Sequence, residues 1–472
     1  MNAKTKDKLL QIPVCLSIFL YSMRFLIKPL GSGDELWNYS FAINISKGYL
    51  PYKDFSMVQT PLSAYITGFL LKIFGNKMLV FRIAAVVLFA MTFLIIYFVC
   101  LEISHEIRLA VTVTAFLASI VSNVWIYNYN HLNLCLIVLI IYLELNNNIK
   151  REYLIDFIYG ILPLIKQNTG GVLLISYWVF SIVECVLKQI SIKVALKRLL
   201  ISIIPGIVFI VVLLLNGSWL YFWEYAICGI STFKHRTLIW KNPSCIGMTL
   251  FCVMTIVVSL YKIVTDRCCI AKKKHCKILV ISIAAGSVAY PLSDFSHCLI
   301  ATVPYVICFI CCFKYKKNSK IMLLFETMCL CILGISFMFA IWIDKDYIMS
   351  KHNHFEGIPI EKKFEDYISL IDNSIEEKAK KNTNVIIADE SAVAYMIPLD
   401  RYTKNFDMLL LGNLGLNTVD DLLNQDSEAE YWIKKESCTF GYQSHFELIQ
   451  YIRDNYQYVG EVGNFDCYRK ED

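Results

Sequence analysis

The stretch Gly31-Ser-Gly-Asp34-Glu35-Leu-Trp37-Asn38-Tyr39 directly follows the first long apolar run of the chain. It places two adjacent carboxylates, Asp34 and Glu35, at what we expect to be a membrane surface. Carboxylates are costly to hold near lipid, which favours a functional role for the pair. The alternative is that Asp34 only caps a short surface helix, because Asp is a good N-cap residue.

Composition predicts a polytopic membrane protein. Hydrophobic residues make up 57% and charged residues 18% of the 472 residues, far more apolar than a soluble globular protein. The N-terminal segment, in which lysines precede an apolar run, resembles a signal peptide. It lacks a small-residue cleavage site, so we expect an uncleaved first helix. The net charge of +6 mostly reflects loop lysines. It therefore argues for membrane topology and lipid contact, with no nucleic acid partner.

The chain continues as a series of apolar stretches. About eleven of them are long enough, or nearly so, to cross about 30 Å of hydrocarbon. They lie at roughly 9–28, 80–101, 109–125, 132–146, 153–167, 171–187, 199–216, 246–264, 278–292, 298–313 and 321–343. Residues 1–343 are therefore predicted to form an α-helical domain with about eleven transmembrane helices.

The positions of Lys and Arg predict the orientation. If the helices alternate in direction, the basic clusters all fall on one side, whereas the loops around 124–131 and 291–297 carry no Lys or Arg. By the positive-inside rule the N-terminus is cytoplasmic and the C-terminus is extracytoplasmic in the cell membrane. Asp34 and Glu35 then lie on the extracytoplasmic face, in a first outer loop of about residues 29–79.

Two further segments lie outside the predicted membrane core. In the first outer loop, the near-helical spacing around 36–45 and the short apolar stretch at 62–74 predict two amphipathic helices along the membrane surface. Residues 344–472 have the composition of a soluble domain. There, apolar strand patterns at 384–389 and 456–468 and intervening helix patterns predict a small extracytoplasmic α/β domain with a largely parallel sheet.

Three polar clusters fall at the same outer surface in this topology: Asp34 with Glu35, Lys166 with Gln167 and Asn168, and Asp294 with His297. Each has a structural alternative. Lys166 is also the kind of side chain that snorkels to lipid headgroups. The Gln167–Gly171 run also fits a helix C-cap and turn, and His297 also fits a residue that satisfies neighbouring carbonyls. Their coincidence on one face favours a functional cleft.

A second outer loop, about 217–245, is rich in aromatic residues and weakly basic. An interfacial aromatic belt is one interpretation. The other is a lid in which Lys234 or Arg236 meets a phosphate.

These motifs resemble those of the GT-C superfamily of integral-membrane glycosyltransferases, with the protein O-mannosyltransferases and the lipid A aminoarabinose transferases as the nearest branches. The resemblance covers most of residues 9–313. It rests on the Asp-Glu pair and the aromatic helix after it, Gly48-x-x-Pro51-Tyr-x-Asp54, Phe74-Gly75 before Arg82, the segment 164–171 and the segment 290–297. Gln59 stands where the aminoarabinose branch has a Lys, and Leu292 stands where an Arg usually follows the proline. Both departures remove a cation that could hold a phosphate.

The resemblance implies a GT-C fold and an inverting transfer of a sugar from a polyprenyl-phosphate donor to a protein, lipid or cell-envelope glycan outside the membrane. Asp34 would be the base on the acceptor hydroxyl, and Glu35 would orient Asp34 or bind the acceptor. Lys166 would neutralise the departing phosphate, and Gln167, Asp294 and His297 would bind donor or sugar. Glu35, Asp294 and His297 could also ligate Mg²⁺, Mn²⁺ or Zn²⁺, although no ligand spacing demands a metal.

Two other classes compete with this hypothesis. A polysaccharide transporter predicts charged or Gly/Pro-broken positions near helix centres and an internal repeat, and the sequence shows neither. A ligase or polymerase that joins lipid-linked glycans would use the same carrier on the same face, so only substrates separate it from a glycosyltransferase.

Overall fold

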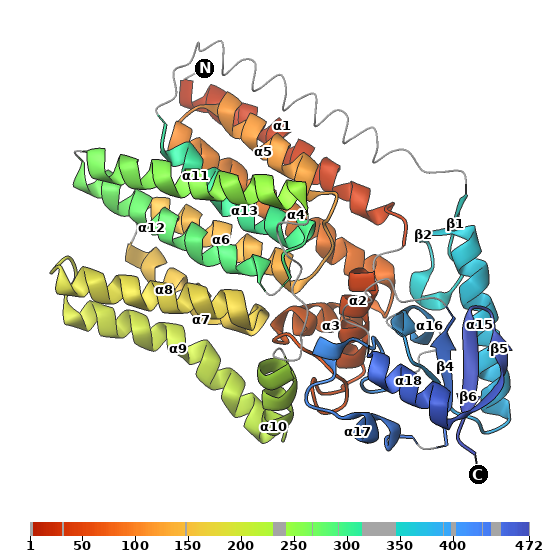
Figure 1. The fold of residues 1–472 in the computed structure, drawn as a ribbon. Coiled ribbons are helices and arrows are strands. Elements are labelled where there is room, and N and C mark those ends of the chain that lie inside the picture. Colours follow the sequence, from red (N-terminus) through yellow and green to blue (C-terminus); the bar gives the residue numbers. More distant parts are fainter. Residues whose placement is uncertain are drawn as a thin grey trace. The chain divides into compact units, whose positions relative to one another are not determined.

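The computed structural model describes residues 3–30, 33–146, 149–229, 242–266, 268–290, 292–313, 346–389, 391–397, 403–426, 428–435 and 445–471 (Figure 1). The chain divides into two compact units. The first, which we call the helical unit, is Met1–Leu26, Ile83–Phe209 and Arg236–Ile343. The second, the mixed unit, is Ile27–Arg82, Ile210–His235 and Asp344–Asp472. The domain boundary that we expect at 343/344 lies outside the described residues.

Long apolar helices build the helical unit. They and their short extensions are α1 (Ala3–Ser22), η1 (Met23–Leu26), α4 (Met78–Ser104), α5 (Ile107–Val121), α6 (Tyr129–Leu145), α7 (Ile149–Ile165), α8 (Gln167–Val186), α9 (Ile192–Leu215), α11 (Pro243–Thr265), α12 (Cys269–Ala285), η5 (Gly286–Ala289) and α13 (Phe295–Cys311). A helix covers every apolar stretch predicted between residues 9 and 313, which confirms those helices. The stretch 321–343 lies outside the described residues.

The ends of these helices differ from the apolar stretches. The helix α12 begins at Cys269, well before the apolar stretch that starts near 278. Its first turns contain Lys272, Lys273 and Lys274, and Lys is a good helix former. A hydropathy pattern predicts only the apolar part of a helix. It does not detect a polar extension of the same helix.

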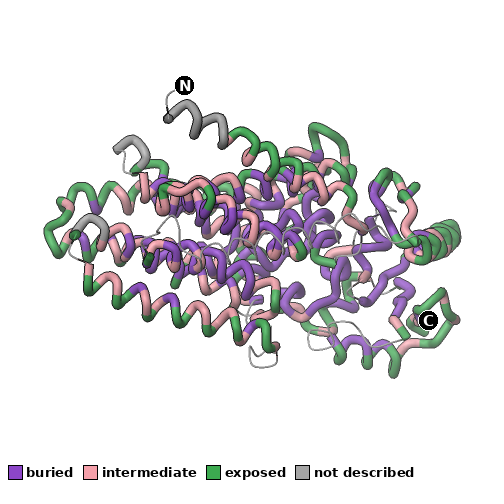
Figure 2. Tube along the Cα trace, turned by 90° about the horizontal axis from the view of Figure 1, so that it is seen from above, coloured by how far each residue is buried: buried purple, intermediate pink, exposed green. Residues whose placement is uncertain are grey.

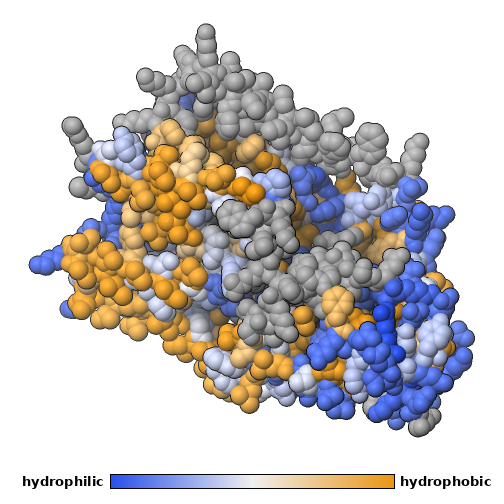
Figure 3. Space-filling view, viewed as in Figure 1, coloured by the Kyte–Doolittle hydropathy of each residue, from blue (hydrophilic) through white to orange (hydrophobic). Residues whose placement is uncertain are grey.

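Four helices of the described part are long and apolar enough to cross a membrane: α4, α8, α9 and α11. The shorter apolar helices include α5, α6 and α13. Large apolar side chains on α9 are exposed, among them Val208 at 56% and Leu215 at 81%. Figure 3 shows such hydrophobic side chains over α9 and α11, and mainly hydrophilic ones over α15 and α18. Exposed apolar surface of this extent indicates contact with lipid, so the chain is a membrane protein. The number of spans and their orientation stay predictions.

The core of the helical unit holds the start of α6 in place. Figure 2 shows buried positions alternating with intermediate and exposed ones along single helices. At Trp125 the indole Nε1 donates to the carbonyl of Ala85, 3.1 Å away, and the ring packs 4.2 Å from that of His131. The loop before α6 is therefore fixed against α4.

In the mixed unit, α2 (Gly33–Ser46) and α3 (Leu62–Phe74) are the two helices predicted in the first outer loop. The helix α3 exposes apolar side chains such as Phe69 and Phe74, as predicted for a surface helix. The helix α2 is not amphipathic, because residues 35–44 are all buried, polar ones included. It packs so closely on α3 that a Cβ at Gly68 would lie 2.7 Å from the side chain of Ile45.

The remaining elements of the mixed unit come from the second outer loop and the C-terminal region. They are α10 (Trp219–Phe222), the π-helix η2 (Trp223–Cys228), β1 (Tyr347–Met349), η6 (Asn353–Phe355), β2 (Pro359–Glu361), α15 (Lys362–Lys380), β3 (Val385–Ile387), α16 (Ala392–Met396), η7 (Leu411–Asn413), α17 (Val419–Leu423), β4 (Glu430–Lys434), α18 (Phe446–Asn455), β5 (Gln457–Val462) and β6 (Phe465–Arg469).

The prediction of a largely parallel sheet is wrong. The strand order is β3-β4-β6-β5, and only β3 and β4 run parallel. The single strand pattern predicted at 456–468 is a β5–β6 hairpin, whose turn contains Gly463 at a φ of +55°. The sequence prediction also missed β4, whose charged Glu430 is fully buried and paired with Lys378 and Arg469. A buried strand that begins with Glu has no apolar alternation to reveal it.

The close contact between α7 and α8 depends on Gly170. A Cβ there would lie 2.2 Å from the backbone carbonyl carbon of Leu162 in α7. We expect Gly170→Ala to destabilise the protein by about 1–3 kcal/mol, because backbone cannot move aside as a flexible side chain does. The measurement is the Tm of the purified protein in detergent.

The neighbouring Gly171 is the matched control. A Cβ at Gly171 would meet nothing within 4 Å, so Gly171→Ala should leave the Tm unchanged or slightly raised. Equal effects of the two substitutions would contradict the contact.

Candidate functional site

The two adjacent carboxylates at the start of α2 have different environments. Glu35 is buried and accepts two hydrogen bonds from Arg82, Nε to Oε1 at 3.0 Å and Nη2 to Oε2 at 2.9 Å. Arg82 is 1% exposed. It also donates to the backbone carbonyls of Lys28 and Pro29. Glu35 is thus held in a two-point ion pair that also fixes the segment before α2.

Asp34 has the opposite environment. It is exposed, and it lies within the first turn of α2, which begins at Gly33. Its backbone carbonyl accepts a hydrogen bond from Asn38 Nδ2 at 2.8 Å. A carboxylate in the first turn is favoured by the helix dipole. Of the pair, Asp34 is therefore the carboxylate that solvent can reach.

Lys166 is the single residue between α7 and α8. Its side chain does not extend to solvent as a snorkelling lysine would, because the residue is 7% exposed. The Nζ donates to Asn130 Oδ1 at 2.7 Å and to the carbonyl of Val288 at 3.3 Å. Burial lowers the pKa of this amine to about 7, although the charge of Asp294 acts in the other direction. Lys166 can therefore change its charge near neutral pH.

Asn130, in the first turn of α6, is a member of the site that the sequence prediction missed. Its Oδ1 accepts from Lys166, and its Nδ2 lies 3.3 Å from His297 Nε2. The signal was present in the sequence: the run 127–131 is polar and aromatic, lies in a loop without Lys or Arg, and is followed by an apolar helix. Buried amides in such a place need partners.

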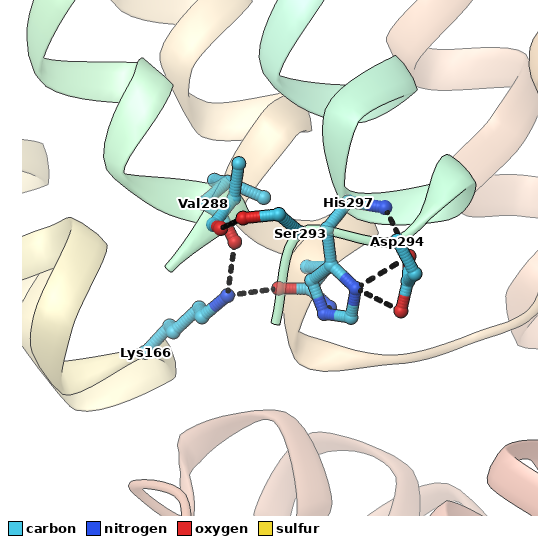
Figure 4. A network of polar contacts seen from close by, with 7 residues as sticks. Lys166, Val288, Ser293, Asp294 and His297 are labelled. Carbon is cyan, nitrogen blue, oxygen red and sulfur yellow. Dashed lines mark hydrogen bonds and ion pairs between the residues drawn. The ribbon is translucent and has the colours of Figure 1, made fainter. Parts of the chain in front are cut away.

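Asp294 and His297 complete the cluster (Figure 4). The Nδ1 of His297 lies 2.9 Å and 2.8 Å from the two carboxylate oxygens of Asp294. The same carboxylate caps α13 by accepting from the backbone N–H of His297 at 2.9 Å. Burial raises the pKa of Asp294, but the hydrogen bonds that its carboxylate accepts, above all from the His297 side chain, outweigh burial and leave the pKa below its usual value. The Asp294 side chain is 45% exposed.

These contacts form one directed chain of hydrogen bonds. Lys166 donates to the Asn130 carbonyl, the Asn130 amide donates to His297 Nε2, and His297 Nδ1 donates to Asp294. Each member has the donor or acceptor that its neighbour requires. The hydrogen bonds in such a chain polarise one another, and here all of them point from the cation towards the carboxylate. The arrangement connects a buried cation to a half-exposed anion.

The structure thus brings the second and third polar clusters together. Asn168 Nδ2 donates to the carbonyl of Tyr290 at 2.6 Å, which adds a further contact between the two segments. Gln167 is the half-buried first residue of α8, so the run that it begins starts a helix and does not cap one. Lys234 and Arg236 lie outside the described residues. Asp34 and Glu35 belong to the mixed unit.

The residues proposed as metal ligands do not form a metal site by themselves. Both Glu35 oxygens bind Arg82, and Asp294 and His297 bind each other. No group of three or more His, Cys, Asp or Glu side chains is placed to hold an ion in the described ranges.

Comparison with known proteins identifies the fold. No family model and no curated protein sequence matches the chain. The structure of ArnT from Cupriavidus metallidurans bound to undecaprenyl phosphate matches with a TM-score of 0.54 and 10% sequence identity, over 99% of this chain and 98% of that one. The Archaeoglobus fulgidus oligosaccharyltransferase in complex with Zn and sulfate gives a TM-score of 0.48 at 10% identity, over 97% and 73%. The chain has the fold of ArnT, a lipid A aminoarabinose transferase, which confirms the GT-C fold that the motifs predicted.

The buried pair of Glu35 and Arg82 should be essential to the mixed unit. Replacing either one, as in Glu35→Ala or Arg82→Ala, leaves the other charge buried and alone, which costs about 3–5 kcal/mol. We expect a large fall in Tm for each single variant, measured on the purified protein. The double variant Glu35→Leu/Arg82→Leu should recover part of the loss, because no unpaired charge remains.

Lys77 and Glu356 form a matched control within the same unit. This ion pair is exposed, and such pairs contribute little to stability. Lys77→Ala should therefore leave the Tm almost unchanged. If Lys77→Ala lowered the Tm as much as Arg82→Ala does, burial would not be the reason why the Glu35–Arg82 pair is needed for stability.

Proposed function

We propose that the protein is an inverting glycosyltransferase that moves a sugar from a polyprenyl-phosphate donor to an acceptor on the extracytoplasmic face of the membrane. The observation that carries this proposal is the division of roles at the start of α2. Glu35 is buried against Arg82, whereas Asp34 is exposed next to it on the same rigid turn. The ArnT fold supports the reaction class, and the undecaprenyl phosphate bound to ArnT supports the type of carrier.

In this reaction Asp34 accepts the proton of the acceptor hydroxyl. The hydroxyl oxygen attacks the anomeric carbon from the face opposite the phosphate, the carbon–oxygen bond to phosphate breaks, and polyprenyl phosphate leaves with that electron pair. The anomeric configuration is inverted. A phosphate is a good leaving group, so a single base suffices. Glu35 acts as a positioning residue, because its pair with Arg82 fixes the turn that carries Asp34.

The cluster in the helical unit would serve the donor. Lys166 would neutralise the leaving phosphate with its ammonium group, whose contacts to Asn130 and Val288 use two of its three N–H donors. The half-exposed Asp294 would accept hydrogen bonds from sugar hydroxyls, and His297 and Gln167 would also bind the donor or its sugar. Lys234 and Arg236 stay candidates for a further phosphate contact.

Asp34→Asn tests the base directly. The amide keeps the size of the side chain but cannot take a proton, so transfer of radiolabelled sugar from polyprenyl-phosphate sugars should fall by about 10²–10⁴-fold. Glu377→Gln, which changes a carboxylate that is 73% exposed on α15, should transfer at the wild-type rate. Both variants are compared with wild type at equal protein level.

The same assay separates the competing reactions. Undiminished transfer by Asp34→Asn would reject Asp34 as the base. Transfer from lipid-linked oligosaccharides, with none from any polyprenyl-phosphate monosaccharide, would instead identify a ligase or polymerase.

Lys166 should give the reaction a pH dependence. Its amine is charged below a pKa of about 7 and neutral above it, so kcat/KM should fall as pH rises through that value. Lys166→Arg keeps its charge throughout this range and should remove the fall, even if the altered shape lowers the rate overall. The measurement is kcat/KM against pH for both proteins; the same fall in the Arg variant would contradict the role of Lys166.

A further inference from the structure

The mixed unit contains a polar groove of about 720 Å³ between residues 411–420 and α18. Its volume is within the range of roughly 300–1,000 Å³ that is usual for small-ligand sites. The groove takes no part in the reaction described above. It lies in the C-terminal region, for which we expect acceptor docking or a cover over the site and not catalysis.

Hydrogen-bond acceptors predominate among the polar groups of the groove. Asp420, Glu447 and Asp454 contribute exposed carboxylates, and no Lys or Arg is among its described lining residues. Gln450 Nε2 donates to Asp454 Oδ1 at 2.8 Å, and Asn455 Nδ2 donates to the carbonyl of Tyr451 at 2.9 Å. These bonds use amide N–H groups and leave the amide oxygens as further acceptors. A fitting ligand is therefore rich in donors and carries no negative charge.

The groove also has an apolar side. The Tyr451 residue is 42% exposed, and Leu411 and Leu414 line the opposite wall. An aromatic ring beside a row of acceptors matches a sugar, whose C–H face packs on apolar surface while its hydroxyls donate at the edge. The amides interleaved with the carboxylates suit hydroxyl groups better than the isolated ammonium groups of a basic peptide.

One wall of the groove is bonded to the π-helix η2. Asn417 Nδ2 donates to Tyr225 Oη at 3.0 Å and to Glu224 Oε1 at 3.3 Å. The Tyr225 hydroxyl in turn donates to Asn405 Oδ1 at 2.9 Å. Turns of π-helix are rare and occur frequently at functional sites. The groove is thus fixed to the outer loop that precedes Lys234 and Arg236 in the chain.

We propose that this groove binds an uncharged, hydroxyl-rich saccharide, and that this saccharide is part of the acceptor. The second half of this inference rests on the proposed function: among the protein, lipid and glycan acceptors open to such a transferase, it selects a glycan or a molecule that carries one. The ligand bears no phosphate at the part that enters the groove, because three carboxylates would repel it.

Saturation-transfer NMR on the full-length protein in detergent tests the groove without any reaction. The probes are maltotriose, chitotriose and mannotriose, with tetralysine and mannose 6-phosphate as comparators. We expect signals from at least one trisaccharide and none from mannose 6-phosphate. Tyr451→Ala combined with Asp454→Asn should weaken trisaccharide binding about ten-fold, because it removes both the ring and a charged acceptor. Both residues are exposed, so the fold should persist, as an unchanged Tm would verify.

Two control variants make the outcome specific. Tyr458→Ala removes a ring that is 54% exposed on β5, away from the groove lining, and should bind as wild type. Asp34→Asn should also bind as wild type, even where transfer is lost, so failure of the proposed reaction is separable from failure of the groove. Binding by no trisaccharide, equal binding by the groove variant, or binding of tetralysine alone would each overturn the proposal.

Discussion

A buried carboxylate must have a partner, and Glu35 finds it in Arg82. The pair is costly to desolvate and is tolerated because both guanidinium bonds have good geometry and further N–H groups reach the carbonyls of Lys28 and Pro29. This constraint fixes where α2 begins relative to the start of α4. It also determines the exposure of the neighbouring Asp34, because consecutive side chains of a helix point in different directions. Burial of Glu35 leaves Asp34 exposed, so the adjacent pair consists of one buried, paired carboxylate and one exposed carboxylate.

The helical unit also contains a buried charged side chain, Lys166, but its partners are neutral hydrogen-bond acceptors. A lysine at a break between two apolar helices needs acceptors, and Asn130 and Val288 provide them. The break can be one residue long because Gly170 lets α8 approach the backbone of α7. Desolvation then lowers the pKa of Lys166, while the chain through Asn130 and His297 connects it to the carboxylate of Asp294. The packing of two helices thus sets the chemistry of the cation between them.

Much of this could be predicted from the sequence, because the bilayer imposes strong rules on it. Apolar length predicted the helices up to residue 313, and the motifs predicted a fold like that of ArnT. The topology predicted only that Lys166, Asp294 and His297 share one surface, and not the hydrogen bonds that connect them through Asn130. The failures arose where tertiary context overrides local pattern. Asn130 looked like a loop residue because its partners come from distant helices. The central strand β4 was missed because it begins with the charged Glu430. Its partners Lys378 and Arg469 are distant in sequence, so no local pattern predicts that this charge is buried. The parallel sheet failed because one glycine turn converted a strand pattern into a hairpin.

The charges of the two units argue for different ligands. The cluster around Lys166 offers an ammonium group at the end of a polarised chain, which suits a phosphate. The groove beside α18 offers three carboxylates and no described cation, which repels a phosphate and accepts hydroxyls. A single ligand does not satisfy both. In the proposed transfer, this separation would keep the charged donor out of the site proposed for the acceptor. The segregation of charge between the units would then be a physical basis for telling the two substrates apart.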